Sequence, residues 1–302
     1  MDWPRMLGMM YVGYGSNLDP RDWSDYCARP EHGVDPDDLR PVTPALLLDH
    51  RLTFNHLSGR WEGGAANVTH SPGDMVPCMA FEVDHPSIWN VLDAKEGVSD
   101  RPGRGVYERF EALALLPDGT AQTVTTYRLT EARLAREAEA GRGPHVPPSE
   151  DYIEAVTRGL AHHGLPSAHL VPASEDRSVA PLQHVFVYGT LLAGEERGHV
   201  LEACERRQAT VTGQLVDLNR GYPGLVPGKA TVHGELVRLP NDAMLSRLDG
   251  IEGFHAHTSP NNLYRRGFVQ VQCEGESVWA WTYYWNGMDL GEAIPSGDWR
   301  QR

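Results

Sequence analysis

The 302-residue chain lacks several features that would point to a membrane, an oxidising compartment or a metal. It has no stretch of about 18 apolar residues, which argues against a membrane-spanning helix. Its four cysteines, Cys27, Cys78, Cys204 and Cys273, are widely spaced and form no C-x-x-C pair. This spacing is typical of reduced thiols in a cytoplasmic protein and argues against a zinc site. The start of the chain carries Asp2 and no long apolar core, so it does not read as a signal peptide.

Basic residues are also scarce: the chain has 27 Lys and Arg against 41 Asp and Glu, which gives a formal net charge of -14. Both halves are acidic, with net charges of -11 over residues 1–180 and -3 over residues 181–302. We therefore expect no nucleic-acid partner. The 14 histidines show no H-E-x-x-H spacing, and the chain has neither a G-x-S-x-G motif nor a Walker loop. We expect no bound metal, no nucleophilic serine of that type and no nucleotide-phosphate loop.

The sequence does contain one set of motifs twice. Met9–Leu18 read MMYVGYGSNL and Val185–Leu192 read VFVYGTLL, and an L-D-x-x-E-G motif follows each, LDAKEG in the first copy and LDGIEG in the second. A Tyr-x-Arg then follows, beginning at Tyr107 and at Tyr264. A long-period repeat of this kind indicates two related domains. We place them at residues 1–172 and 183–302, joined by a polar linker at residues 173–182, and each is long enough to form its own core.

Strand patterns outnumber helix patterns in both copies, which predicts α+β domains built on curved sheets. Each L-D-x-x-E-G motif is predicted at the end of a helix, which begins at Pro86 in the first copy. A second helix is expected over Ser149–His163. The predicted strands span residues 7–13, 45–54, 65–68, 78–83, 110–116, 122–127, 185–188, 231–239, 267–273 and 278–285.

The Tyr-Gly loops and the glutamates are the candidate chemistry. A strand that ends in Tyr-Gly-Ser or Tyr-Gly-Thr can turn successive backbone N–H groups toward an anion, although an isolated copy is more often an ordinary turn. The repetition favours the anion site. Glu96 and Glu252 end their helices, where the helix dipole and apolar neighbours would raise a carboxyl pKa. The alternative is a solvated helix-end acid. Asp93 and Asp249 are expected to bond to the backbone instead.

Two further features stay open at this point. The loops Trp61–Ala65 and Gly221–Gly224 are either turns between strands or walls of a pocket. Arg109 and Arg266 either pair with acids and orient a pocket, or lie on the surface beside a strand.

These residues together resemble the γ-glutamylcyclotransferase family. The first domain is similar to γ-glutamylcyclotransferase over nearly its whole length, through YVGYGSNL, WEGGAA, LDAKEGV, Tyr107-x-Arg109 and PPSEDYIEAVTRGLAHHGLP. The second resembles the smaller γ-glutamylamine cyclotransferase group, through VFVYGTLL, GYPGLVPG, LDGIEGF and Tyr264-x-Arg266. His169 departs from the pattern, because a tyrosine is expected there, and a tandem fusion is itself unusual for the family.

The resemblance implies a small mixed β-barrel flanked by helices in each domain, and a reaction without metal or organic cofactor. The implied substrate is a small-molecule γ-glutamyl amide, whose α-amine attacks its own γ-carbonyl to release 5-oxoproline and an amine. Glu96 and Glu252 would be the catalytic proton carriers. The backbone N–H groups of Gly15–Leu18 and Gly189–Leu192 would hold the substrate carboxylate and the developing oxyanion. The implied substrate-binding residues are Tyr14, Gly15, Ser16, Asn17, Leu18, Tyr107, Tyr188, Gly189, Thr190, Leu191 and Tyr264.

Other functions remain open on the sequence. A hydrolase that releases glutamate would act on the same bond with water. Alternatively, one domain serves only as a γ-glutamyl binding or scaffolding module, because a shared fold does not guarantee a shared activity. The sequence makes no statement on the oligomeric state or on which amine is released.

Overall fold

The computed structural model describes residues 10–302, and these form two compact units. The first unit comprises residues 10–114 and 122–181, and the second comprises Leu115–Ala121 together with Leu182–Arg302. The strand predicted from Leu7 begins at Met10, while its residues 7–9 and the expectation about a signal peptide lie outside the described part. No helix within residues 10–302 is both long and apolar enough to cross a lipid bilayer.

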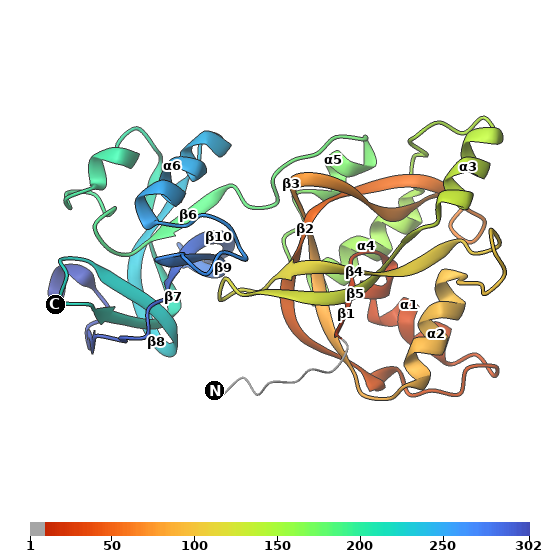
Figure 1. The fold of residues 1–302 in the computed structure, drawn as a ribbon, viewed down its shortest axis with the longest axis horizontal. Coiled ribbons are helices and arrows are strands. Elements are labelled where there is room, and N and C mark those ends of the chain that lie inside the picture. Colours follow the sequence, from red (N-terminus) through yellow and green to blue (C-terminus); the bar gives the residue numbers. More distant parts are fainter. Residues whose placement is uncertain (1–9) are drawn as a thin grey trace. The chain divides into compact units, whose positions relative to one another are not determined.

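The first unit is a closed five-stranded barrel in the order β1-β3-β2-β4-β5 (Figure 1). The short strand β1 (Met10–Gly13) pairs antiparallel with β3 (Gly63–Val83) and in parallel with β5 (Ala121–Leu129). The long β2 (Leu39–Ser58) and β4 (Tyr107–Leu115) complete the ring. The mixed pairing places the end of β1, and the loop after it, inside a wall built from distant parts of the sequence.

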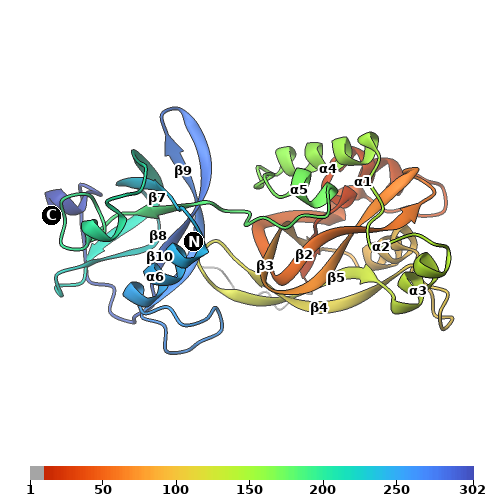
Figure 2. The same ribbon diagram turned by 90° about the horizontal axis from the view of Figure 1, so that it is seen from above.

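Helices surround this barrel, and local sequence sets their ends. Asp19 caps the first helix by accepting a hydrogen bond from the Arg21 N–H, and Pro20 occupies the first turn. Ser149 caps α4 in the same way. Figure 2 shows α4 and α5 along one side of the barrel. The helices are α1 (Pro20–Cys27), α2 (Ser87–Glu96), α3 (Glu131–Glu139), α4 (Glu150–His162) and α5 (Leu170–Ser174), with 3-10 turns at Ser16–Leu18 and Pro36–Asp38.

The core of the first unit lies inside the barrel and under α2 and α4. Leu47, Phe54 and Leu160 are fully buried there. On α2, Ile88 and Leu92 are one turn apart and fully buried, so this helix is fixed against the barrel by an i, i+4 apolar pair. Because Glu96 lies one further turn along the same face, the packing that buries Leu92 also directs Glu96 toward the barrel.

The second unit repeats this architecture. Its sheet has the order β11-β7-β8-β6-β10-β9, and β7 also pairs with β9, so that five strands close into a ring. The strand β6 pairs antiparallel with β8 and in parallel with β10, as β1 does with β3 and β5. The elements are β6 (His184–Val187), β7 (Arg206–Asp217), β8 (Pro223–Arg238), α6 (Asp242–Glu252), β9 (Tyr264–Cys273), β10 (Glu276–Trp285), β11 (Glu292–Ala293) and 3-10 turns at Gly198–Leu201 and Trp299–Gln301.

The predicted α+β class and the pair of mixed barrels are confirmed. Five elements, α1, α3, α5, β7 and β11, were not predicted, although the Asp19-Pro20 cap is a recognisable start signal for α1. The predicted strands at residues 65–68 and 78–83 are two parts of the single strand β3. Helix α5 (Leu170–Ser174) ends inside the stretch expected to act as a linker, residues 173–182.

Candidate functional site

The first unit contains a cavity of about 220 Å³ at the end of β1. Six residues predicted from the sequence line it, namely Tyr14, Gly15, Ser16, Asn17, Glu96 and Tyr107. Trp61 and Ala65 of the loop left open by the sequence also line it. The other lining residues were not singled out, namely Tyr11, His56, Ser58, Arg60, Ala66, Lys95, Gly97, Val106, Thr126, Tyr127 and Tyr152. Of the two alternatives for the Trp61–Ala65 loop, the structure therefore supports the wall of a pocket.

Glu96 is held at this cavity by a helix end and by one amide. The helix α2 ends at Glu96 because Gly97 adopts a left-handed conformation with φ of 64°. The Asn17 Nδ2 group donates to Glu96 Oε1 at 2.7 Å and to the Tyr11 hydroxyl at 2.8 Å. These two bonds use both hydrogens of the amide, so the motif Tyr-Gly-Ser-Asn connects directly to the glutamate.

Burial raises the pKa of Glu96 above its ordinary value, while the Lys95 charge and the Asn17 hydrogen bond oppose that rise. The residue is only partly shielded from solvent, since it faces the open cavity, yet the surrounding protein atoms still disfavour its charged form. The carboxyl is thus shifted toward the range in which a group can both accept and return a proton.

Two cations line the first cavity, and both contact one buried aspartate. Lys95 Nζ lies 2.6 Å from Asp22 Oδ2, and Arg60 pairs with Asp22 Oδ1. Burial lowers the pKa of Lys95, and the contact with Asp22 opposes this effect. Each cation of this cavity therefore has an ion-pair partner within the protein.

The tyrosines of the first cavity fasten its walls to one another. The Tyr14 hydroxyl donates to the Tyr127 carbonyl at 2.7 Å, and the Tyr107 hydroxyl donates to the Ala66 carbonyl at 2.7 Å. The Tyr152 hydroxyl accepts from the Ala66 N–H at 3.1 Å. Because these hydroxyls are engaged with backbone, they keep the loop, β3 and α4 at fixed separations.

The second unit has a corresponding cavity of about 280 Å³ at the end of β6. All six residues predicted for this domain line it, namely Tyr188, Gly189, Thr190, Leu191, Glu252 and Tyr264. The remaining lining residues are Phe186, Val187, Arg197, Tyr222, Pro223, Ile251, Leu263 and Tyr283. Tyr222 and Pro223 show that the second glycine-rich loop is also a cavity wall.

Glu252 occupies the position of Glu96 but has different neighbours. The helix α6 ends at Glu252, and Gly253 follows with φ of 61°. Within residues 10–302, no donor forms a hydrogen bond to its carboxylate, because Leu191 stands where the first unit has Asn17. Burial raises the pKa of Glu252 to about 7, and the positive charge of Arg197 opposes this rise.

The aspartates of both L-D-x-x-E-G motifs bind side chains, so the expectation that they bond to the backbone is wrong. The Tyr127 hydroxyl donates to Asp93 at 2.8 Å, and Arg109 makes a two-point ion pair with the same carboxylate. In the second unit the donors to Asp249 are the Tyr283 hydroxyl at 2.8 Å and Arg266 at 2.6 Å. These pairs attach each glutamate-bearing helix to its barrel.

Two other expectations are modified by the structure. Leu18 does not line the cavity, and its N–H donates to the Gly15 carbonyl at 3.0 Å, as the Leu192 N–H does to Gly189. The N–H groups of Leu18 and Leu192 therefore close their turns and do not face the cavities. Tyr127 and Tyr283 were missed, although they follow Tyr107 and Tyr264 by 20 and 19 residues, a spacing that the repeat could have shown.

Each arrangement supports proton transfer at a carboxyl group in a partly enclosed, tyrosine-lined cavity. A carboxyl with a raised pKa can accept a proton from an ammonium group and return it to a leaving amine. The described residues contain no group of three or more His, Cys, Asp or Glu side chains arranged to hold a metal ion.

Comparisons with known proteins identify the family. A family model described as "Gamma-glutamyl cyclotransferase, AIG2-like" matches residues 185–301. The gamma-L-glutamyl-butirosin B gamma-glutamyl cyclotransferase of Niallia circulans is 34% identical over 122 residues, which cover 40% of this chain and 77% of that protein. A putative gamma-glutamylcyclotransferase of Vibrio cholerae is 36% identical over 126 residues, covering 40% of this chain and 99% of that protein.

A solved structure named gamma-glutamyl cyclotransferase covers 56% of this chain, and 85% of its own chain takes part in the match. Its sequence identity is 25% and its TM-score is 0.42. The relatives and the two equivalent barrels lead to one conclusion: the chain belongs to the gamma-glutamyl cyclotransferase family and carries two family-like units in tandem.

Proposed function

We propose that the protein cleaves a γ-glutamyl amide by intramolecular attack of the substrate's α-amine on its γ-carbonyl. The products are 5-oxoproline and a free amine or amino acid, and the proposed reaction uses no metal or organic cofactor. The observation that carries this proposal is the repeated pairing of a Tyr-Gly loop with a helix-end glutamate whose pKa is raised, in a cavity of each unit.

In the proposed mechanism the glutamate first takes a proton from the α-ammonium group of the substrate. The freed amine attacks the γ-carbonyl carbon, and the carbonyl oxygen carries the negative charge of the tetrahedral intermediate. The protonated glutamate then gives its proton to the departing nitrogen as the oxyanion re-forms the carbonyl and the C–N bond breaks. The regenerated carboxylate takes the second proton from the ring nitrogen and passes it to the released amine, which leaves as an ammonium ion. Ring closure is intramolecular, so holding the folded conformer supplies much of the acceleration.

We assign the proton transfers to Glu96 and Glu252. The Tyr-Gly loops would receive the charged groups of the substrate through backbone N–H groups. The relative from Niallia circulans is named for γ-L-glutamyl-butirosin B, so removal of a γ-glutamyl group from a larger metabolite is within the proposed substrate class. All four cysteines are free thiols in the described structure, in keeping with the proposed cytoplasmic location.

The test is mass-spectrometric detection of 5-oxoproline from a panel of γ-glutamyl amides. Wild type is compared with Glu96→Gln, Glu252→Gln and the double variant. Each substitution is expected to reduce turnover in its own unit by about 10²–10⁴-fold, as for loss of a general acid–base. Glu139→Gln is the matched control, because Glu139 is an exposed glutamate at the end of α3 that lines neither cavity.

Loss in one single variant would assign the activity to that unit and leave the other as a binding module. Loss only in the double variant would assign activity to both. Free glutamate in place of 5-oxoproline would replace the cyclotransferase with a hydrolase. Full activity in the double variant would refute the role of both glutamates.

A further inference from the structure

The second cavity contains a cation that the proposed mechanism does not use. Arg197 lines this cavity, and its side chain is exposed at the rim. Its backbone N–H donates to the Thr190 carbonyl at 2.8 Å, so it lies directly beside the Tyr-Gly-Thr loop. Its charge is near enough to Glu252 to oppose the rise in the pKa of that carboxyl. Arg197 therefore belongs to the same site as the glutamate.

Arg197 has no ion-pair partner in the part of the chain that the structure describes. The first cavity differs, since its two cations, Lys95 and Arg60, share the carboxylate of Asp22. A guanidinium without an ion-pair partner at a cavity is suited to bind a carboxylate, because its planar group of N–H donors matches both oxygens. The second cavity thus has a cation that is free to pair with a ligand, whereas both cations of the first cavity are paired with Asp22.

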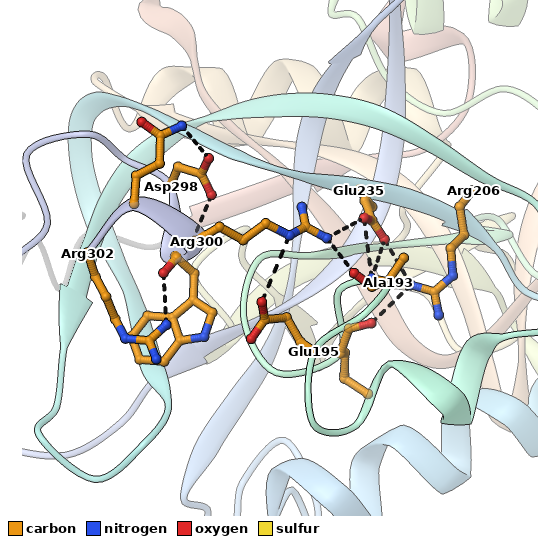
Figure 3. A network of polar contacts seen from close by, with 10 residues as sticks. Ala193, Glu195, Arg206, Glu235, Asp298, Arg300 and Arg302 are labelled. Atoms are coloured by element: carbon orange, nitrogen blue, oxygen red, sulfur yellow. Dashed lines mark hydrogen bonds and ion pairs between the residues drawn. The ribbon is translucent and has the colours of Figure 1, made fainter.

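The segment that carries Arg197, residues 191–201, is held in place by hydrogen bonds that involve the buried carboxylate of Glu235 (Figure 3). Glu235 is 1% exposed and accepts hydrogen bonds from Arg206 at 2.8 Å, from Arg300 at 3.0 Å and from the Ala193 N–H at 3.1 Å. Burial alone would raise the pKa of Glu235, but these donors outweigh that effect and lower it. Glu235 therefore stays ionised and holds two arginines in place.

The two arginines then bind the segment itself. Arg206 donates to the carbonyls of Leu191, Gly198 and Leu201 at 3.0, 2.7 and 3.2 Å. Arg300 donates to the Ala193 carbonyl at 2.7 Å. The turn is tight, because a Cβ atom at position 198 would lie 2.3 Å from the Leu192 carbonyl oxygen. Residues 191–201 are thus fixed at four points around Arg197.

We propose that Arg197 binds a carboxylate group of the substrate in the second site, and that Glu235 positions the segment that presents it. This inference rests on the proposed function, since the ligand is a γ-glutamyl amide. The chemistry matches the substrate, because the α-ammonium and the α-carboxylate of a γ-glutamyl group share one carbon. Glu252 would face the ammonium while Arg197 faces a carboxylate. When the departing amine is an amino acid, its carboxylate is a second ligand of the same class.

The test uses the full chain with Glu96→Gln, so that only the second site turns over. γ-Glutamylalanine carries both carboxylates, whereas γ-glutamylethylamide carries only that of the glutamyl group. We expect Arg197→Gln to raise KM by about tenfold or more, with a smaller change in kcat, because the lost charge-assisted hydrogen bond would act equally on ground and transition states. Arg197→Lys should raise KM less than Arg197→Gln does, because lysine keeps the positive charge.

The two substrates separate the sources of the carboxylate. A raised KM for both identifies the glutamyl carboxylate, and a raised KM for γ-glutamylalanine alone identifies that of the departing amino acid. An unchanged KM for both overturns the proposal. Arg247→Gln is the control, because it removes an exposed charge from α6 outside the cavity. Its effect should be small for both substrates.

Glu235→Gln tests the positioning role. It should raise KM for the same substrate as Arg197→Gln, and the two changes together should raise KM no further than Arg197→Gln alone. Additive effects on KM would refute the link between Glu235 and Arg197. The link would also be refuted if Glu235→Gln lowered thermal stability and left KM unchanged.

A binding measurement keeps this inference separate from the proposed function. Titration calorimetry with the Glu96→Gln/Glu252→Gln protein measures Kd for both amides, with and without Arg197→Gln. A higher Kd with Arg197→Gln supports the carboxylate contact. If wild type then forms no 5-oxoproline, only the proposed function fails. Identical isotherms overturn the contact whatever the turnover.

Discussion

The two glutamates end equivalent helices of equivalent barrels, yet their neighbours differ. Glu96 accepts a hydrogen bond from Asn17 and follows Lys95, whereas the second unit has Leu191 and Ile251 at those positions. Burial raises the pKa of both carboxyls, but only the first is counteracted by an adjacent donor. One backbone arrangement therefore places a carboxyl among different neighbours in the two units, and these neighbours act on the cost of its ionisation.

The units also differ in how they hold the loop after the Tyr-Gly motif. In the first unit, Arg158 of α4 donates to the buried Asp19 at 2.9 and 3.1 Å, which fastens the start of α1. In the second unit, which has no counterpart of α4, Glu235 and two arginines hold the corresponding segment. A buried carboxylate fixes the loop in both units. It is Asp19 of the loop itself in the first unit and Glu235 of β8 in the second.

The largest expected difference concerns the aspartates behind the glutamates. The side chains of Asp249 and Arg266 are 17% and 11% exposed, against 28% and 34% for Asp93 and Arg109. The cost of removing one partner rises with burial, from about 1 kcal/mol or less for an exposed pair to about 3–5 kcal/mol for a fully buried one, and the Asp249 pair lies between these limits. Asp249→Ala should therefore destabilise its unit more than Asp93→Ala. Urea unfolding measures both, and equal losses would contradict the difference in burial.

A second comparison uses the dependence of stability on pH. Because the pKa of Glu252 is about 7 in the folded protein and near 4.5 when exposed, its ionisation destabilises the fold as pH rises through this window. Glu252→Gln should remove that penalty, which amounts to about 3 kcal/mol at pH 8 and vanishes near pH 4. Glu96→Gln should stabilise less, because Asn17 and Lys95 already support the charge. Thermal unfolding at both pH values measures this, and a pH-independent effect would contradict it.

The smallest expected change comes from exchanging the residues that distinguish the two bases. Asn17→Leu removes the donor to Glu96 and should move the acidic limb of the first site's rate profile to higher pH. Leu191→Asn should move that of the second site below 7, since a hydrogen bond to a charged group contributes about 1.5–3 kcal/mol. Each is measured as kcat against pH with the other glutamate changed to Gln. Unmoved limbs would show that this residue does not set the difference.

Much of this architecture could be predicted from the sequence. The repeated motifs indicated two related units, and the apolar spacing of α2 with a following glycine indicated where Glu96 lies. The lining residues at the Tyr-Gly loops were anticipated in the same way. These features depend on neighbours a few residues apart, so local patterns are sufficient to reveal them.

Only the tertiary structure brought the remaining groups to the sites. Asn17 and Glu96 are 79 residues apart, and Ala193 and Glu235 are 42 apart, so neither contact has a local signal. Lys95 and Arg197 look like ordinary charged residues until the structure shows that one has a buried partner and the other has none among the described residues. The sequence by itself determined the repeated units and the candidate bases, whereas long-range packing decided which charges are compensated, because burial and contact distance depend on how the barrel closes.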